Sequence, residues 1–170
     1  MLQRTGPFDV VVALRLAAEA GTFAQIAEEL AVVPSQVQLA VRRLAAANLL
    51  RPGARSTNAR ALHEFLSHGV RFAFPAPKGQ LANGVPTAYS APPLSAEVDA
   101  LDVLVWPAPL HPAAVQGFSI APLYRAAHTL IDRSPRTYQL LAVTDTLRLG
   151  DASMRLLATE RMAQLLRVRA

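Results

Sequence analysis

The sequence predicts a mainly helical α+β fold, in which an N-terminal group of helices is followed by a β-hairpin and a helical extension. Apolar residues recur every three or four positions through most of the chain, whereas residues alternate in character only in short stretches of its middle. Of the 170 residues, 52% are hydrophobic, many of them alanine, and 17% are charged, which argues against a disordered chain.

The first predicted helix covers residues 8–20. Gly6 and Pro7 precede it, Asp9 lies in its first turn, where a negative charge is favourable, and Gly21 ends it. Its apolar side would pack on the two helices that follow.

Two helices joined by a tight turn are predicted between Thr22 and Leu50. Thr22 and Gln25 have the spacing of a capping box, which starts the first of them. The apolar pattern breaks at residues 31–33. Pro34 then suits the first turn of the second helix, because proline has no N–H group to leave unpaired.

The second helix of this pair has two distinct faces. Its predicted buried stripe, spaced by three and four, contains Val37, Ala40, Val41 and Leu44. Its opposite stripe contains Ser35, Gln36, Gln38, Leu39, Arg42 and Arg43. The helix therefore presents a polar and basic face to solvent.

The run IAEELAVVPSQVQLAVRRLAAANLL resembles bacterial winged helix-turn-helix regulators of the MarR-like kind, and the resemblance extends from Phe8 to roughly Arg51. It implies that the second helix enters the major groove of double-stranded DNA with its N-terminal residues on base edges. Val33 stands where such proteins usually place a Ser or Thr N-cap, and Leu39 stands where they usually place a polar residue.

Positive charge is concentrated around this motif. Between Leu30 and Ala96 the only acidic residue is Glu64. The same window contains seven basic residues: Arg42, Arg43, Arg51, Arg55, Arg60, Arg71 and Lys78. Such clustering is typical of a polyanion-binding protein, and it favours DNA binding over a domain that only packs against protein.

A β-hairpin is predicted after a fourth helix at residues 59–68. Residues 70–74 alternate in character, which predicts a strand, and residues 85–90 would form the return strand. The tip between them would be the wing, which places Arg71 and Lys78 on DNA phosphates. The alternative is that this proline-rich stretch is a linker.

A boundary is predicted at residues 91–93, which read APP. It divides the chain into a DNA-binding domain, residues 1–92, and an extension, residues 93–170, for dimerisation or partner binding. The extension is expected to contain strands at residues 101–106 and 115–120 and helices at residues 122–130, 135–149 and 152–168, the last one capped by Asp151.

Motifs of catalysis are absent from the sequence: it has no glycine-rich phosphate loop, no GxSxG, no HExxH and no cysteine. We therefore expect a protein that is not an enzyme and has no cofactor or metal. No apolar run approaches the roughly 18 residues that cross a bilayer. The N-terminus also lacks the pattern of a signal peptide, so a cytoplasmic location without membrane contact is expected.

These observations predict a DNA-binding transcriptional repressor that acts as a homodimer on a palindrome, with the tail helices as the dimer surface. Its expected DNA-binding residues are Ser35, Gln36, Gln38 and Leu39 toward the bases, and Arg42, Arg43, Arg51, Arg55, Arg71 and Lys78 on phosphates. The alternative is an antitoxin whose extension binds and neutralises a co-encoded toxin, because some seventy residues after Pro93 exceed what a minimal winged domain needs.

Overall fold

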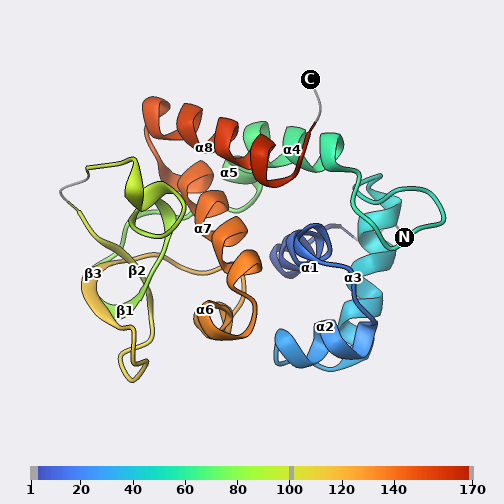
Figure 1. Ribbon diagram of the computed structural model, residues 1–170, viewed down its shortest axis with the longest axis horizontal. Helices are drawn as coiled ribbons and strands as arrows, with labels where there is room; N and C mark the ends of the chain where they lie inside the picture. The colour runs from blue at the N-terminus through green and yellow to red at the C-terminus, as the bar shows by residue number, and fades with distance from the viewer. Residues whose placement is uncertain (1–3, 100–101, 169–170) are drawn as a thin grey trace.

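The computed structural model describes residues 4–99 and 102–168. Three helices form one end of the molecule, three short strands form the other, and α7 lies between them (Figure 1). The helices are α1 (Pro7–Ala18), α2 (Phe23–Glu29), α3 (Pro34–Ala46), α4 (Ala59–His68), α5 (Val70–Ala73), α6 (Leu130–Arg133), α7 (Pro135–Leu149) and α8 (Ala152–Leu165). The strands are β1 (Leu81–Pro86), β2 (Leu104–Pro107) and β3 (Val115–Ser119), with short 3-10 helices at Ala88–Ser90, Leu94–Ala96 and Ala127–Thr129. The fold is α+β and mainly helical, as predicted.

Local capping chemistry starts several helices where the sequence predicts them. Thr22 and Gln25 form the reciprocal capping box of α2, with Gln25 N donating to Thr22 Oγ1 at 3.2 Å and Thr22 N donating to Gln25 Oε1 at 2.9 Å. α3 begins at Pro34. Asn58 and Asp151 each accept a hydrogen bond from a first-turn N–H group, of α4 and α8 respectively.

A short hairpin follows α3 at residues 50–57, whereas the sequence predicts a hairpin later in the chain, from residues 70–74 and 85–90. Leu50 and Thr57 form an isolated antiparallel bridge, and Arg51 N donates to Ser56 O at 2.9 Å. Residues 51–56 therefore close a tight loop, here called the 51–56 loop, directly between α3 and α4.

The prediction of a strand at residues 70–74 is wrong. Val70–Ala73 form helix α5, because Gly69 keeps a right-handed helical conformation (φ −107°, ψ −38°) and does not stop the helical path of α4. Val70 is fully buried in the core, whereas Phe72 is 72% exposed. A short apolar run fits one helical turn as well as a strand, and here the packing of α5 against α7 decides. A wing at residues 75–84 is therefore not formed by this segment.

The three strands form a small closed barrel in which each strand pairs with both others. β1 runs antiparallel to β2 and to β3, while β2 and β3 run parallel to each other. The runs predicted as strands at residues 101–106 and 115–120 overlap β2 and β3, although residue 101 lies outside the described residues. Because β2 and β3 run parallel, they are not the two arms of one hairpin. Residues 88–90 of the predicted return strand form a 3-10 helix instead.

Gly84 of β1 pairs with both other strands, with Pro107 of β2 and Val115 of β3. A Cβ atom added to Gly84 would lie 2.0 Å from Trp106 O, a backbone atom that has no rotamer with which to move away. We expect Gly84→Ala to lower the free energy of unfolding by about 1–3 kcal/mol or more, as overpacking does. Urea denaturation checks this. Asn83→Ala on the same strand is the matched control, since Asn83 is exposed and should cost under about 0.5 kcal/mol. Equal stability of the two variants would contradict the prediction.

The tail contains the two long helices that the sequence predicts, α7 and α8. α7 is buried along almost its whole length, from Thr137 to Arg148. The short helix predicted at residues 122–130 is displaced to Ala127–Arg133, because Leu123 enters the core without helical hydrogen bonding around it. Of the two long tail helices only α8 has an exposed face to offer a partner copy.

One hydrophobic cluster joins α1, α3 and α4 to α7 and α8, so residues on both sides of position 92 share a core. The domain boundary at position 92 stays a prediction. Among the described residues, no single helix has the length and apolarity to cross a membrane, and α1 with α2 reach both only across a 113° bend.

Candidate nucleic-acid interface

The outward face of α3 is the first component of the candidate site. Val37, Ala40 and Leu44 are fully buried against the rest of the protein. The opposite side of the helix is exposed and lies at the outer edge of the molecule (Figure 1). This side, here called the α3 surface, contains Ser35, Gln36, Gln38, Leu39 and Arg42. The helical spacing therefore predicted correctly which of these side chains face solvent.

The amino end of α3 adds hydrogen-bond donors to this surface. Its N-cap is Val33, which has no side-chain oxygen, and no side chain caps the helix. Within the described part of the chain, Ser35 N–H has no acceptor. A helix start of this kind carries partial positive charge and is suited to an anion such as a phosphate.

Arg43 does not belong to the α3 surface. Its guanidinium binds the Asp9 carboxylate of α1 through both Nε and Nη2, at 2.7 and 2.6 Å. Asp9 is fully buried, and Arg43 is 22% exposed. The structure thus places Arg43 in an ion pair with a buried carboxylate and outside the α3 surface, and its expected phosphate contact stays a prediction.

Two ion pairs fix α3 and α2 relative to α1. One is the Asp9–Arg43 pair just described. In the other, Arg15 of α1 donates to both carboxylate oxygens of Glu29 on α2, through Nη2 at 2.8 Å and through Nε. Arg15 is 2% exposed and also donates to Glu19 O. Buried, bidentate contacts of this kind orient helices more rigidly than surface pairs do.

The 51–56 loop places two exposed arginines next to α3 in the chain. Arg55 stacks its guanidinium over the ring of Phe23, the first residue of α2, at 5.1 Å from the centroid. Arg51 is exposed at the start of the loop. Both side chains are exposed, and their role on phosphates stays a prediction. The sequence did not predict a hairpin in the loop that carries them.

Arg71 and Lys78 lie elsewhere. Arg71 is on α5, with its guanidinium 4.3 Å from the ring centroid of Phe72. Lys78 precedes β1, binds Asp102 at 2.5 Å and lies over the Phe118 ring. The strands are at the opposite end of the molecule from α3 (Figure 1). The hairpin through which these two residues were assigned to DNA does not form, so the structure does not bring them to the α3 surface, and their contact with DNA stays a prediction.

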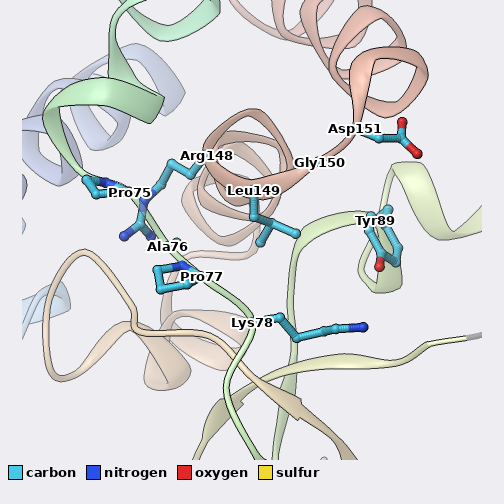
Figure 2. Close-up of a pocket in the computed structure, with 9 residues that line it drawn as sticks. All are labelled: Pro75, Ala76, Pro77, Lys78, Tyr89, Arg148, Leu149, Gly150 and Asp151. Carbon is cyan, nitrogen blue, oxygen red and sulfur yellow. The ribbon is translucent and has the colours of Figure 1, made fainter.

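A second candidate site is the cavity of about 570 Å³ beside the end of α7 (Figure 2). Arg148 lines it next to residues 75–77, and Lys78 and Tyr89 lie at its other side (Figure 2). Both cations are engaged: Lys78 binds Asp102, and Arg148 binds Asp145 and two backbone carbonyl oxygens. The described residues contain no cluster of three or more His, Asp or Glu side chains that is suited to a metal. We therefore assign no chemistry to this cavity.

Sequence reasoning overlooked two features of the interface end. Arg60, at the start of α4, is exposed beside the 51–56 loop, and the Asn58 cap that precedes it was the available signal. Asp9 was interpreted only as a favourable charge in the first turn of α1, and nothing local in the sequence indicates its partner 34 positions away.

Comparison of the chain with protein-family models, with curated proteins and with solved structures gave no match.

Proposed function

We propose that the chain is a DNA-binding transcriptional regulator of the winged helix-turn-helix, MarR-like kind, which inserts α3 into the major groove. The observation that carries the proposal is the α3 surface: a polar face with one arginine, exposed on a helix whose other face is fully buried. α3 starts with an uncapped amino end, the end that such helices direct at base edges.

Each side chain of the α3 surface has a chemically defined task in this proposal. Gln36 and Gln38 offer an amide donor and acceptor, which match the N6 and N7 edge of adenine. Ser35 is adaptable, and Leu39 suits the methyl group of thymine. Arg42 lies further along the helix and would bind a phosphate.

The 51–56 loop takes the position of the wing in this proposal. It follows α3 directly, and its exposed Arg51 and Arg55 would bind the backbone beside the groove that α3 reads. Regulators of this kind act as homodimers on two half-sites about one helical turn apart, and occupation of a promoter represses transcription.

The test is a binding titration on DNA selected from a fragment library of the source genome, read by fluorescence anisotropy at several salt concentrations. The logarithm of the association constant should fall linearly with the logarithm of the salt concentration. Arg42→Ala should reduce that slope by about one and weaken binding to all sequences alike. Gln38→Ala should instead cost about 1–3 kcal/mol on the selected sequence alone.

Arg125→Ala is the matched control, because Arg125 is exposed outside the α3 surface. It should change neither the slope nor the affinity. Binding without a salt slope would overturn the proposal, since neutralisation of phosphates must release counterions.

Binding of a partner protein, as by an antitoxin, is the second candidate function. This candidate is favoured by the length of the chain after Pro93, which exceeds what a minimal winged domain needs. Within that part, Leu110 of the β2–β3 loop is 98% exposed and Leu156 of α8 is 64% exposed. Co-purification with the product of the adjacent gene would support this candidate. A stable homodimer that ignores that product would contradict it.

A further inference from the structure

A second basic feature of the molecule is a cavity of about 850 Å³ on the side of α4 and α8. Three segments far apart in the sequence meet there: the end of α1, the 51–56 loop with the start of α4 that follows it, and the residues after α8. Figure 1 shows the start of α4, the loop and the end of α8 near one another. The lining residues are Leu16, Ala17, Arg51, Ser56, Thr57, Asn58, Ala59, Arg60, Leu166, Arg167 and Val168.

Three arginines line this cavity: Arg51, Arg60 and Arg167. No aspartate or glutamate is among the lining residues. Within residues 4–99 and 102–168, none of these three exposed side chains donates a hydrogen bond or forms an ion pair, whereas the less exposed Arg15, Arg43 and Arg148 each do. Like charges gathered without a counter-charge repel one another, and an anion between them removes that repulsion.

The first turn of α4 adds neutral donors to the same cavity. Asn58 uses its side chain to cap Ala61 N at 3.3 Å, which leaves the N–H groups of Ala59 and Arg60 without an acceptor in the described part of the chain. α4 has ten residues, so its amino end carries the partial positive charge of a full helix. The hydroxyl groups of Ser56 and Thr57 line the cavity as well.

We propose that this cavity, here called the arginine pocket, binds a phosphate group. Three guanidinium groups that line one cavity, together with helix N–H donors, match the oxygens of a tetrahedral phosphate better than a planar carboxylate, which one arginine satisfies. The volume lies within the range of small-molecule sites. The phosphate belongs either to a small phosphorylated compound or to the DNA backbone.

The test is isothermal titration of the full chain with inorganic pyrophosphate in a phosphate-free buffer, without DNA. The wild-type protein should show saturable binding, and Arg167→Gln and Arg60→Gln should each weaken it about tenfold. Arg167→Lys should retain part of the affinity, because it keeps the charge but loses the forked geometry. Arg125→Gln, an exposed arginine remote from the pocket lining, is the control and should bind as the wild type does.

All three substituted arginines are exposed, so thermal melting should show that each variant folds as the wild type does. Absence of saturable binding, or equal loss in the Arg125→Gln control, would overturn the proposal. The source of the phosphate follows from competition: displacement of pyrophosphate by duplex DNA assigns the pocket to the backbone, and its failure assigns a small phosphorylated ligand. The pyrophosphate titration contains no DNA, so a failure of the proposed regulator function leaves this result unaffected.

Discussion

Arg148→Met should lower the free energy of unfolding by about 3–5 kcal/mol, the cost of leaving a buried charge without its partner. Arg148 donates to the Asp145 carboxylate at 2.6 Å, and both side chains are at most 4% exposed. Methionine is apolar and unbranched, and its side chain follows the path of the arginine stem. The substitution therefore removes the charge and fills most of the space that the stem occupied.

The loss extends beyond one ion pair because Asp145 and Arg148 join four segments. Asp145 accepts hydrogen bonds from Thr87 after β1, at 2.8 Å, and from Trp106 of β2, at 2.7 Å. Arg148 donates to the backbone oxygens of Phe74 and Ala121. The pair therefore anchors the strands to α7, and we expect its loss to loosen that end of the molecule first.

The pH dependence of the loss identifies its cause. Complete burial raises the pKa of Asp145 above its ordinary value, and Arg148 opposes the shift. Without Arg148 the pKa rises further. A carboxyl group with a raised pKa in the folded state stabilises the fold below its unfolded pKa and loses that contribution as the pH rises through the folded pKa. The deficit of Arg148→Met should therefore shrink as the pH falls toward the ordinary pKa of an aspartate.

The measurement is urea denaturation followed by circular dichroism and by fluorescence of Trp106, the only tryptophan of the chain, which touches Asp145 directly. Asp145→Asn combined with Arg148→Met should lose less stability than Arg148→Met alone, because no buried charge remains. Arg125→Met at an exposed position should stay within about 0.5 kcal/mol of the wild type. A similarly small effect of Arg148→Met would contradict the role of the pair.

The parts of the fold that follow from neighbours in sequence could be predicted. Thr22 with Gln25, Pro34 and Asp151 act on backbone groups within one helical turn, so their positions fix the starts of α2, α3 and α8. Residues 70–73 show the limit of such reasoning, because their alternation is compatible with two structures and burial of Val70 beside α7 selects the helix.

Pairing between distant segments could not be predicted. Nothing in residues 104–107 or 115–119 indicates that these two strands pair in parallel, or that β1 pairs antiparallel with the second edge of each. The order of the strands is decided by the whole barrel. The candidate site divides in the same way. Helical spacing identified the exposed residues of α3, but it gave Arg42 and Arg43 the same role, and only the position of Asp9 distinguishes them.

Arg42 and Arg43 should therefore give opposite results when each is replaced by alanine. Arg43→Ala should lower the free energy of unfolding by about 3 kcal/mol, the lower end of the range for buried pairs, because Arg43 retains some exposure. It leaves the fully buried Asp9 carboxylate with the Gly6 N–H as its remaining donor, at 2.7 Å. Arg42→Ala should stay within about 0.5 kcal/mol of the wild type, because Arg42 is exposed.

The binding assay should show the reverse order. At a temperature where both variants are folded, Arg42→Ala should weaken DNA binding at every sequence and reduce the salt slope, whereas Arg43→Ala should bind with nearly the wild-type slope. Asp9→Asn combined with Arg43→Ala should recover part of the lost stability, because an asparagine still accepts from Gly6 N and carries no charge. If Arg43→Ala were instead stable and selectively defective in DNA binding, Arg43 would leave Asp9 in the complex, and the rigid attachment of α3 to α1 would be wrong. If Arg42→Ala bound DNA as the wild type does, Arg42, the one exposed cation of α3, would not belong to the proposed interface. The contacts to the DNA backbone would then come from the 51–56 loop.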